Sequence, residues 1–441
     1  MRDILIISIV FAGAFAALRQ PWIGVMLWTW LSIMNPHRYS YGFAYDAPVA
    51  AIAFCATILG LIITKDRTSP FKAGAVTMFV MFMVWISLST AFGLDPADDY
   101  WQWNKVMKVD AMIIVALMLL HSRKHILALT WVAAGSLALL GAKGGLFTLM
   151  TGGNFRVWGP PGSFIEDNNE FALSLVMAIP LLRFLQMQLL NRWGRHVLSL
   201  VMLLCVAASL GSYSRGALLA ISAMAVFLWW NGKNKPVVGM ILVLLVPLVI
   251  AFMPDAWMGR MSSIGEYQED DSSMGRISAW WNAWNIAFHY PFGVGFNAAR
   301  PELFAQYSPY PDMVHAAHSI YFQVLGNHGF IGLFLFLSIW LATWSSAGWL
   351  RTHSARIPEA AWCADLGAMC QVCLVGYAVG GAFLSLAYFD LPYNVMVLVV
   401  VARVWVQTRG WEREAAYVPG WKNIPGLARK PPVVAPVKKY V

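Results

Sequence analysis

Long apolar runs follow one another through most of this chain, and they constrain its fold more than any other feature. Most of the runs come close to the roughly 20 residues that a helix needs to cross a lipid bilayer. Hydrophobic residues make up 59% of the chain and charged residues only 12%, with a mean hydropathy of +0.60. These values are typical of proteins that cross a membrane many times. The sequence therefore predicts an all-α polytopic membrane protein.

The lysines and arginines between the runs indicate the orientation of the chain, because cytoplasmic loops are enriched in them. Five connections are basic: 65–72, 121–125, 183–195, 231–235 and 351–356. The intervening connections are acidic or mixed: 95–100, 152–169, 211–214, 255–317 and 388–391. We expect about twelve transmembrane helices, with the basic connections and both termini in the cytoplasm and the other connections in the periplasm. The formal net charge of +9 then reflects cytoplasmic loops and an anionic partner more than nucleic acid.

The first two apolar runs are the ambiguous part of this topology. Residues 4–18 and 22–34 are each too short to span a bilayer comfortably, and Arg19-Gln20-Pro21 separates them. We interpret the two runs as one broken crossing. A thirteenth crossing results if each half spans separately.

The whole pattern divides the chain into four segments. Residues 1–253 hold the first transmembrane helices, including the turn with Arg215, and residues 254–317 form a large periplasmic loop. Residues 318–408 hold the last transmembrane helices. Residues 409–441 are rich in proline and carry scattered basic residues, so we expect a disordered cytoplasmic tail that contacts anionic membrane lipid.

Small residues and cysteines within the apolar runs have packing interpretations. Gly141 with Gly145, and Gly376 with Gly380, have the four-residue spacing that lets helices approach closely in lipid. All five cysteines also lie within apolar runs. We expect free, buried thiols and no disulfide framework.

Three polar groups of residues stand out from the apolar background, all in connections expected to be periplasmic. The first is the turn Gly211-Ser-Tyr-Ser-Arg-Gly-Ala217, which places Arg215 in the first turn of the next helix. A cation there opposes the helix dipole, so it needs an anionic partner. We interpret Arg215 as part of a phosphate site formed by the guanidinium and backbone N–H groups. The alternative is an arginine that reaches toward lipid headgroups.

The second group is the stretch 272–289 within the large loop. Its pattern puts apolar and polar side chains on opposite faces of a helix: Ile277, Trp280, Trp284 and Phe288 against Ser278, Asn282, Asn285 and His289. This is typical of an amphipathic helix on a membrane surface. With Ser272 or Ser273 as its cap, Arg276 falls in its first turn. Arg215 and Arg276 would then bind the two phosphates of a pyrophosphate.

The third group is the pair His315 and His318, where the chain becomes apolar again. A histidine at such a position is either an interfacial anchor or a catalytic group. Because two arginines accompany it on the same side, we interpret His318 as catalytic and His315 as a supporting residue. The acidic run Glu269-Asp-Asp271 is interpreted as a solvated loop and not as a metal site.

Taken in order, these motifs resemble the O-antigen ligase and polymerase superfamily. The motifs are Ser-Arg-Gly-Ala at 214–217, Gly-Arg at 275–276, Pro-Phe-Gly-Val-Gly at 291–295, and His-Ser-Ile-Tyr at 318–321 with a Gly-x-x-Gly that ends at 332. The segment Glu166-Asp-Asn-Asn-Glu-Phe-Ala172 also fits the pattern. Within the superfamily the chain is most similar to ligases of lipopolysaccharide assembly. It departs at Ser319, where many relatives have Asn, and at His328, where Glu is often found.

The resemblance implies a glycosyltransferase that moves O-antigen polysaccharide from undecaprenyl pyrophosphate to a sugar hydroxyl of lipid A-core, with inversion at the anomeric carbon. It implies a multi-pass protein of the bacterial inner membrane, with an active site that faces the periplasm and with no metal or other cofactor. In that chemistry His318 is the general base, and Arg215 and Arg276 stabilise the leaving pyrophosphate. Four residues would have supporting roles: His315, Asn168, Asn169 and Tyr321.

The sequence leaves other functions open. Within the superfamily, an O-antigen polymerase differs only in its acceptor, and a protein O-oligosaccharyltransferase is a further alternative. A transporter or flippase would also use many spans and intramembrane charge, but the charged groups here cluster at one membrane face. A structural scaffold would leave Arg215, Arg276 and His318 without a role.

Overall fold

The computed structural model describes residues 1–231, 251–262 and 271–414, together with residues 235, 236, 239, 240, 244 and 247. These residues form helices and no strand, in agreement with the predicted all-α class. The α-helices are α1 (Arg2–Arg19), α2 (Pro21–Met34), α3 (Val49–Ile63), α4 (Gly74–Ala91), α5 (Pro96–Leu119), α6 (Arg123–Met150), α7 (Asn168–Gln188), α8 (Arg192–Gly211), α9 (Arg215–Asn231), α11 (Asp255–Ser262), α12 (Asp271–His289), α13 (Pro301–Tyr307), α14 (Ile320–His353), α15 (Ala361–Gly381) and α16 (Asp390–Gln407). Four short 3₁₀ helices accompany them: η1 (Pro36–Tyr39), η2 (Ser354–Arg356), η3 (Pro358–Ala360) and η4 (Gly410–Glu412).

Many of these helices have the length and composition of membrane spans. Seven helices in the described part of the chain are long and apolar enough to cross a bilayer: α4, α6, α7, α8, α14, α15 and α16. Three shorter apolar helices are α2, α3 and α9. The protein is thus a multi-pass, all-helical membrane protein. The count of twelve crossings and the sidedness of the connections stay predictions.

Side-chain caps fix the starts of four consecutive long helices. Asp95, Ser122, Asp167 and Asn191 precede α5, α6, α7 and α8, and the side chain of each accepts a hydrogen bond from a backbone N–H of the first turn. Those N–H groups have no partner inside the helix, so a cap stabilises the helix start. The polar residues that interrupt the apolar runs therefore set where the helices begin.

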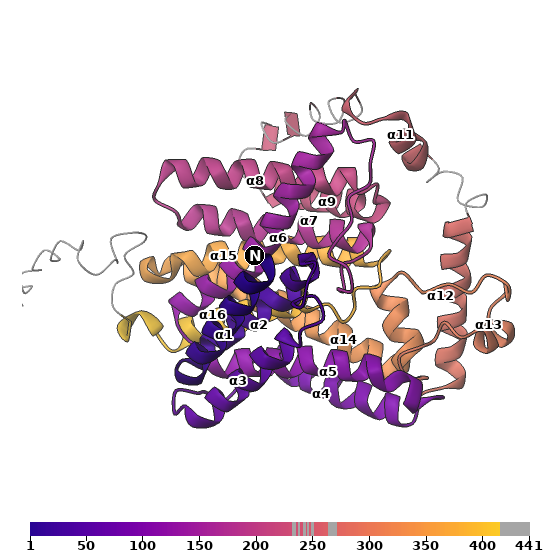
Figure 1. Cartoon of the computed structure of the whole chain (residues 1–441), viewed down its shortest axis with the longest axis horizontal. Coiled ribbons are helices and arrows are strands. Elements are labelled where there is room, and N and C mark those ends of the chain that lie inside the picture. The colour runs from indigo at the N-terminus through magenta and orange to yellow at the C-terminus, as the bar shows by residue number, and fades with distance from the viewer. Residues whose placement is uncertain are drawn as a thin grey trace, which may run out of the picture.

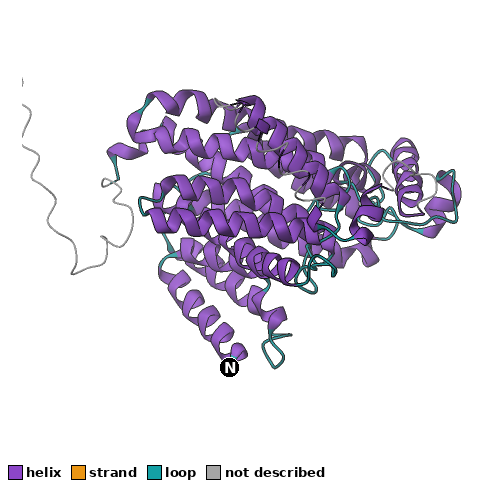
Figure 2. Cartoon of the chain, turned by 90° about the horizontal axis from the view of Figure 1, so that it is seen from above, coloured by secondary structure: helices purple, strands orange, loops and turns teal. Residues whose placement is uncertain are grey.

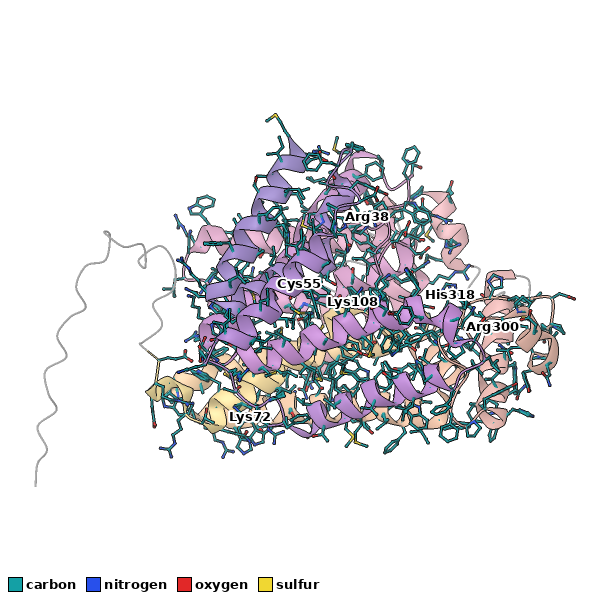
Figure 3. All side chains as sticks on the ribbon, turned by 60° about the horizontal axis from the view of Figure 1, so that its bottom comes forward. Arg38, Cys55, Lys72, Lys108, Arg300 and His318 are labelled. Carbon is teal, nitrogen blue, oxygen red and sulfur yellow. The ribbon has the colours of Figure 1, made fainter. Side chains whose placement is uncertain are left out.

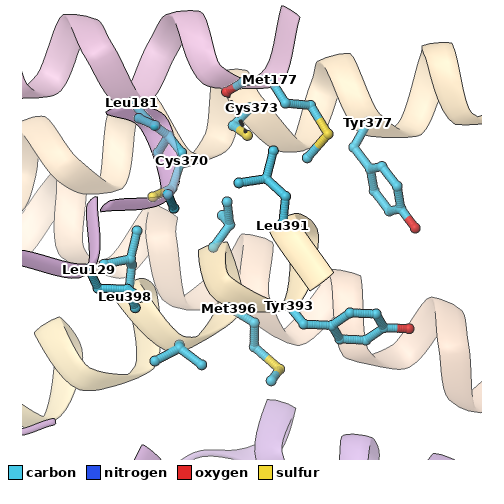
Figure 4. Packing of buried hydrophobic residues seen from close by; sticks show 14 of the residues in the cluster. Leu129, Met177, Leu181, Cys370, Cys373, Tyr377, Leu391, Tyr393, Met396 and Leu398 are labelled. Carbon is cyan, nitrogen blue, oxygen red and sulfur yellow. Dashed lines mark hydrogen bonds between the residues drawn. The ribbon is translucent and has the colours of Figure 1, made fainter. Parts of the chain in front are cut away.

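The centre of the bundle is formed by α7 and α16, which are the most enclosed of the candidate spans. Figure 4 shows side chains of α6, α7, α15 and α16 packed together there, among them Met177, Cys370 and Leu391. The expectation of free thiols holds for all five cysteines, and four of them are buried. Cys55 on α3 is exposed, so the expectation that every thiol is buried was wrong for this one residue.

The two predicted glycine pairs lie where helices approach closely. A methyl group at Gly145 would overlap the backbone of Leu204 on α8, and one at Gly380 would press on Leu173 of α7 and Ala220 of α9. Without a hydrophobic driving force between helices in lipid, such close backbone packing contributes much of the association. The packing interpretation of these glycines is confirmed.

The amino-terminal helices differ from the expected single broken crossing. At Gln20 the chain turns back, so that Gly13 of α1 lies against Leu27 of α2, and Ala17 lies against Gly24. Two halves of one crossing would run end to end and would not meet face to face. The helices instead form a hairpin, because the restricted backbone before and at Pro21 breaks the helix there.

One end of the bundle carries the helices of the predicted loop. Figure 1 shows long helices such as α4, α5 and α8 running in roughly one direction, with α12 lying across one end of the bundle and α13 beside it. Figure 2 shows the same bundle from above, again with the long helices side by side. The expected surface helix is present, and it is placed across the ends of the long helices.

The two faces of α12 differ from those of an ordinary amphipathic helix. The polar face is turned inward: Ser278 and Asn282 are buried, and Asn282 Nδ2 donates to Ala298 O at 2.9 Å. The aromatic face is turned outward, with Trp284 42% and Phe288 64% exposed. Exposed aromatic rings beside apolar helices are typical of the membrane interface. The side-chain amides of α12 thus bind the backbone of the loop that follows it, and the exposed rings of α12 can contact lipid.

Candidate active site

Three segments of the chain meet at the end of the bundle that carries α12. They are the turn before α9, helix α12 itself, and the irregular segment that leads into α14. Figure 3 shows His318 and Arg300 toward this end of the bundle and Lys72 toward the opposite end. The structure thus brings together the three polar groups that the sequence singled out.

The turn before α9 is held by buried hydrogen bonds. Asn168 Nδ2, at the start of α7, donates to Ser212 O at 2.6 Å. Tyr213 adopts a positive φ of 63°, and its hydroxyl donates to Gly153 O at 2.8 Å. Ser214 Oγ accepts from Ala217 N at 3.2 Å and caps the first turn of α9. Asn168 therefore supports the site through the backbone of this turn.

Arg215 is the first residue of α9, as the sequence predicts. Its Nε donates to Arg260 O at 2.9 Å, and Arg260 Nε in turn donates to Tyr213 O at 3.1 Å. These two bonds tie α11 to the turn before α9. The Nε–H of Arg215 is thereby fixed by the protein, which sets the direction of its guanidinium group.

Arg276 lies on α12, but one turn later than predicted. The helix begins at Asp271, so Ser272 and Ser273 are inside it and Arg276 falls in its second turn. The predicted cap was wrong because the helix starts before both serines. Only Arg215 of the two arginines thus lies at a helix terminus.

Arg215 and Arg276 nevertheless line one pocket, which we call the arginine pocket. It has a volume of about 230 Å³, and its other walls are apolar side chains such as Trp280 and Phe383. Guanidinium groups bind phosphate oxygens through charge-assisted hydrogen bonds, which are stronger beside apolar walls than in water. Such a pocket can bind an anion with two charged groups.

His318 lies two residues before the start of α14 in a strained conformation, with a φ of +40°. The preceding residue is held in place, because Trp280 Nε1 donates to Ala317 O at 2.7 Å. Burial lowers the pKa of His318 below its ordinary value, the charge of Arg276 lowers it further, and Asp167 partly opposes this. The ring is therefore neutral at neutral pH and can accept a proton. Positive φ at a residue other than glycine is common at functional sites.

Glu170 is a site residue that sequence reasoning did not single out. It is buried in the first turn of α7, and its Oε1 lies 4.0 Å from Nδ1 of His318. The same oxygen accepts from Ser385 N at 3.5 Å, in the loop between α15 and α16. An acidic residue at the start of an apolar run was visible in the segment 166–172, but nothing in the sequence connected it with His318.

Asn169 and Tyr321 each make hydrogen bonds to residues of the surrounding helices and turns. Both the N–H and the Nδ2 of Asn169 donate to Asp167 Oδ1, each at 2.8 Å. The hydroxyl of Tyr321 donates to Ala378 O at 2.8 Å and ties α14 to α15. The contacts that these two residues make are with the scaffold around His318.

His315 is exposed and packs on α12. A methyl group at Gly275 would overlap its ring, so the glycine before Arg276 makes room for this histidine. His315 also lines a second pocket of about 170 Å³, which it shares with Asn282, Asn297 and Gln323. We call this the amide pocket.

The Pro-Phe-Gly-Val-Gly turn braces the helix that follows the histidines. Helix α14 is kinked at Gly329, with a φ of 67°, and Asn327 O there accepts from Val294 N at 2.9 Å and from Gly295 N at 3.1 Å. His328 is fully buried, and its Nδ1 lies 2.7 Å from Ser89 Oγ. His328 is thus a structural histidine at the kink.

Glu269 and Asp270 of the acidic run lie outside the described residues, and Asp271 is the first residue of α12. Among the residues that are described, no group of three or more His, Cys, Asp or Glu side chains could hold a metal ion.

Comparison with known families identifies two parts of the chain. The model of the family described as O-antigen ligase matches residues 173–337, and a family of unknown function (DUF5935) matches residues 1–189. None of the curated proteins matches the chain. The first match includes Arg215, Arg276, His315 and His318, and it confirms the superfamily that the motifs resemble. The roles of the individual residues stay predictions.

Proposed function

As a member of the O-antigen ligase and polymerase superfamily through residues 173–337, this chain is, we propose, an inverting, metal-independent glycosyltransferase. Its donor is O-antigen polysaccharide on undecaprenyl pyrophosphate, and its acceptor is a sugar hydroxyl of lipid A-core. It acts in the bacterial inner membrane with its active site toward the periplasm. The observation that carries the proposal is the arginine pocket, because two arginines from distant segments line it and the charge of one of them, Arg276, acts on His318.

The reaction divides between the arginines and the histidine. His318 takes the proton of the acceptor hydroxyl, whose oxygen then forms a bond to the anomeric carbon of the donor. The bond between that carbon and the phosphate oxygen breaks, and the pyrophosphate leaves with the electron pair. Arg215 and Arg276 stabilise the charge that accumulates on the leaving group.

Glu170 completes this division of roles. Its Oε1 lies 4.0 Å from Nδ1 of His318, too far for a hydrogen bond, so Glu170 helps to position the ring by packing beside it. Asn168, Asn169, Tyr321 and His315 support the two segments on which the arginine and the histidine lie.

The membrane setting fits substrates that are both attached to lipids. The exposed rings of Trp284 and Phe288 on α12 lie at the same end of the molecule as the arginine pocket. A lipid-linked pyrophosphate has its phosphates at the membrane surface, where α12 lies across the ends of the spans.

Deletion of the gene, followed by gel analysis of lipopolysaccharide, tests the function. A ligase predicts loss of long chains together with accumulation of lipid-linked polymer. Core that carries a single repeat would indicate a polymerase, and loss of glycan from a protein with normal lipopolysaccharide would indicate a protein O-oligosaccharyltransferase. Unchanged glycans on every acceptor would contradict a glycosyltransferase.

A further inference from the structure

The amide pocket lies on the other side of α12 from the arginine pocket. Helix α12 gives Arg276 and Trp280 to the arginine pocket, and it gives Ala279 and Asn282 to the amide pocket. The loop after α15 divides in the same way, with Phe383 in the first pocket and Ser385 in the second. Two separate elements thus contribute to both pockets.

His318 lines neither pocket itself, but it has a neighbour in each. The residue before it, Ala317, lines the amide pocket. The charge of Arg276, in the arginine pocket, acts on its ring. The ring of Trp280, which lines the arginine pocket, stacks on the ring of Phe322 in the amide pocket, with 5.1 Å between centroids.

Apart from His315, the side chains that line the amide pocket are uncharged. Its described lining contains no Asp, Glu, Lys or Arg, whereas the arginine pocket has two arginines. The polar groups are mostly side-chain amides, accompanied by the aromatic rings of Phe296, Phe304 and Phe322. Amides supply both donors and acceptors to hydroxyl groups, and aromatic rings pack against apolar C–H faces. This combination suits an uncharged sugar and does not suit a phosphate.

Three amides on the wall have unused hydrogen-bonding capacity. Asn282 is only 1% exposed, and its Oδ1 has no hydrogen-bond partner among the described residues. The oxygens of Asn297 and Gln323 accept from the backbone N–H groups of Ala299 and Ala387, which leaves their amide N–H groups available as donors. A buried polar atom without a partner costs free energy. A ligand hydroxyl in the pocket would supply that partner.

The size of the pocket limits what it holds. Its volume of about 170 Å³ corresponds to the share of about six water molecules in the liquid, and it is below the roughly 300 Å³ of a pocket for a whole ligand. It therefore takes one part of a substrate. The exposed residues His315 and Ala316 lie at its mouth.

We propose that the amide pocket binds the acceptor sugar, an uncharged pyranose whose attacking hydroxyl points toward His318. This rests on the proposed function: in an inverting displacement, the nucleophile approaches from the side opposite the leaving group. With the pyrophosphate in the arginine pocket, the acceptor comes from the other side of His318, where the amide pocket lies. The donor sugar then occupies the space between the two.

A steric plug at the mouth tests the proposal. Ala316→Trp fills the pocket from an exposed position, and Val314→Trp, at an exposed neighbour that does not line the pocket, is the matched control. Asn297→Asp is a second variant, because it keeps the oxygen that accepts from Ala299 and removes the amide donor. Initial rates of transfer are measured with lipid A-core varied at saturating donor, and with lipid-linked O-antigen varied at saturating acceptor.

The acceptor KM of Ala316→Trp and of Asn297→Asp should rise about tenfold or more, while the donor KM stays within about twofold of the wild type and Val314→Trp behaves as the wild type. An unchanged acceptor KM in both pocket variants, or a rise in donor KM instead, overturns the acceptor assignment. If Ala316→Trp does not accumulate in membranes, Asn297→Asp decides alone. Absence of transfer by the wild type would instead contradict the proposed function itself.

Discussion

The arginine pocket and the amide pocket lie on either side of His318 and differ in almost every physical property. The first has two guanidinium groups, one of them on a residue whose Nε is fixed by the backbone of Arg260. The second has neutral amides and three phenylalanine rings. One helix, α12, therefore contributes both to a pocket with two arginines and to a pocket lined mostly by amides and aromatic rings. The predictions below test whether the two pockets have separate roles.

Loss of the base should have the largest effect. His318→Ala is expected to lower the transfer rate by about 10²- to 10⁴-fold, the usual contribution of a general base. His315→Ala should cost much less, because its exposed ring lies at the mouth of the amide pocket. Both are measured as transfer of lipid-linked polymer to core in membranes with equal amounts of protein. Normal transfer by His318→Ala together with loss in His315→Ala would mean that the other histidine is the base.

Substitutions in the arginine pocket should have the second-largest effect on transfer. Arg215→Lys and Arg276→Lys keep the charge but lose the planar fork that binds phosphate oxygens in pairs, so we expect transfer to fall by about tenfold or more. The assay is the same, with membrane levels of each variant measured by immunoblot. Near-normal transfer by both lysine variants would indicate that these arginines contact lipid headgroups and do not bind the pyrophosphate.

The pH dependence of transfer should show whether Arg276 in the arginine pocket acts on the base His318. Because only the neutral ring accepts a proton, kcat/KM is expected to fall as the pH drops below the pKa of His318, and the lowered pKa keeps the enzyme active to more acidic pH than an ordinary histidine would. Arg276→Gln removes a charge that lowers this pKa, so the acidic limb of its profile should move to higher pH. An unmoved limb in Arg276→Gln would show that the charge of Arg276 does not act on the base.

A smaller effect is expected where α12 meets His315. Gly275→Ala adds a methyl group that would overlap the His315 ring, which then has to move. We expect transfer to fall a few-fold, on the order of 1 kcal/mol in barrier height. Gly135→Ala on α6 is the control, because a methyl group there meets no other atom within 4 Å. Equal activity of the two variants would show that the position of His315 does not matter.

Chelation should have the smallest effect. The proposed mechanism places arginines at the leaving group, so EDTA is expected to leave the activity of purified protein unchanged. Activity that is lost with EDTA and restored by Mn²⁺ or Mg²⁺ would overturn the arginine mechanism.

The sequence was most informative where a residue's role depends on its neighbours along the chain. Apolar runs predicted the spans, and the polar turn placed Arg215 at the start of α9, since both depend on local pattern. It was less informative where the role depends on contacts between distant segments. The hairpin at Gln20, the inward polar face of α12 and the approach of Glu170 to His318 all arise from tertiary packing. No short-range pattern encodes such contacts.

The most direct test of the separation is donor binding in the absence of any acceptor. Purified wild-type protein, His318→Ala and Arg276→Lys are titrated with undecaprenyl pyrophosphate, and the three dissociation constants are compared. We expect His318→Ala to bind within about threefold of the wild type, and Arg276→Lys to bind about tenfold more weakly or worse. Equal binding by wild type and Arg276→Lys, or loss of binding in His318→Ala, would contradict the division between a pocket for the leaving group and a histidine for the chemistry.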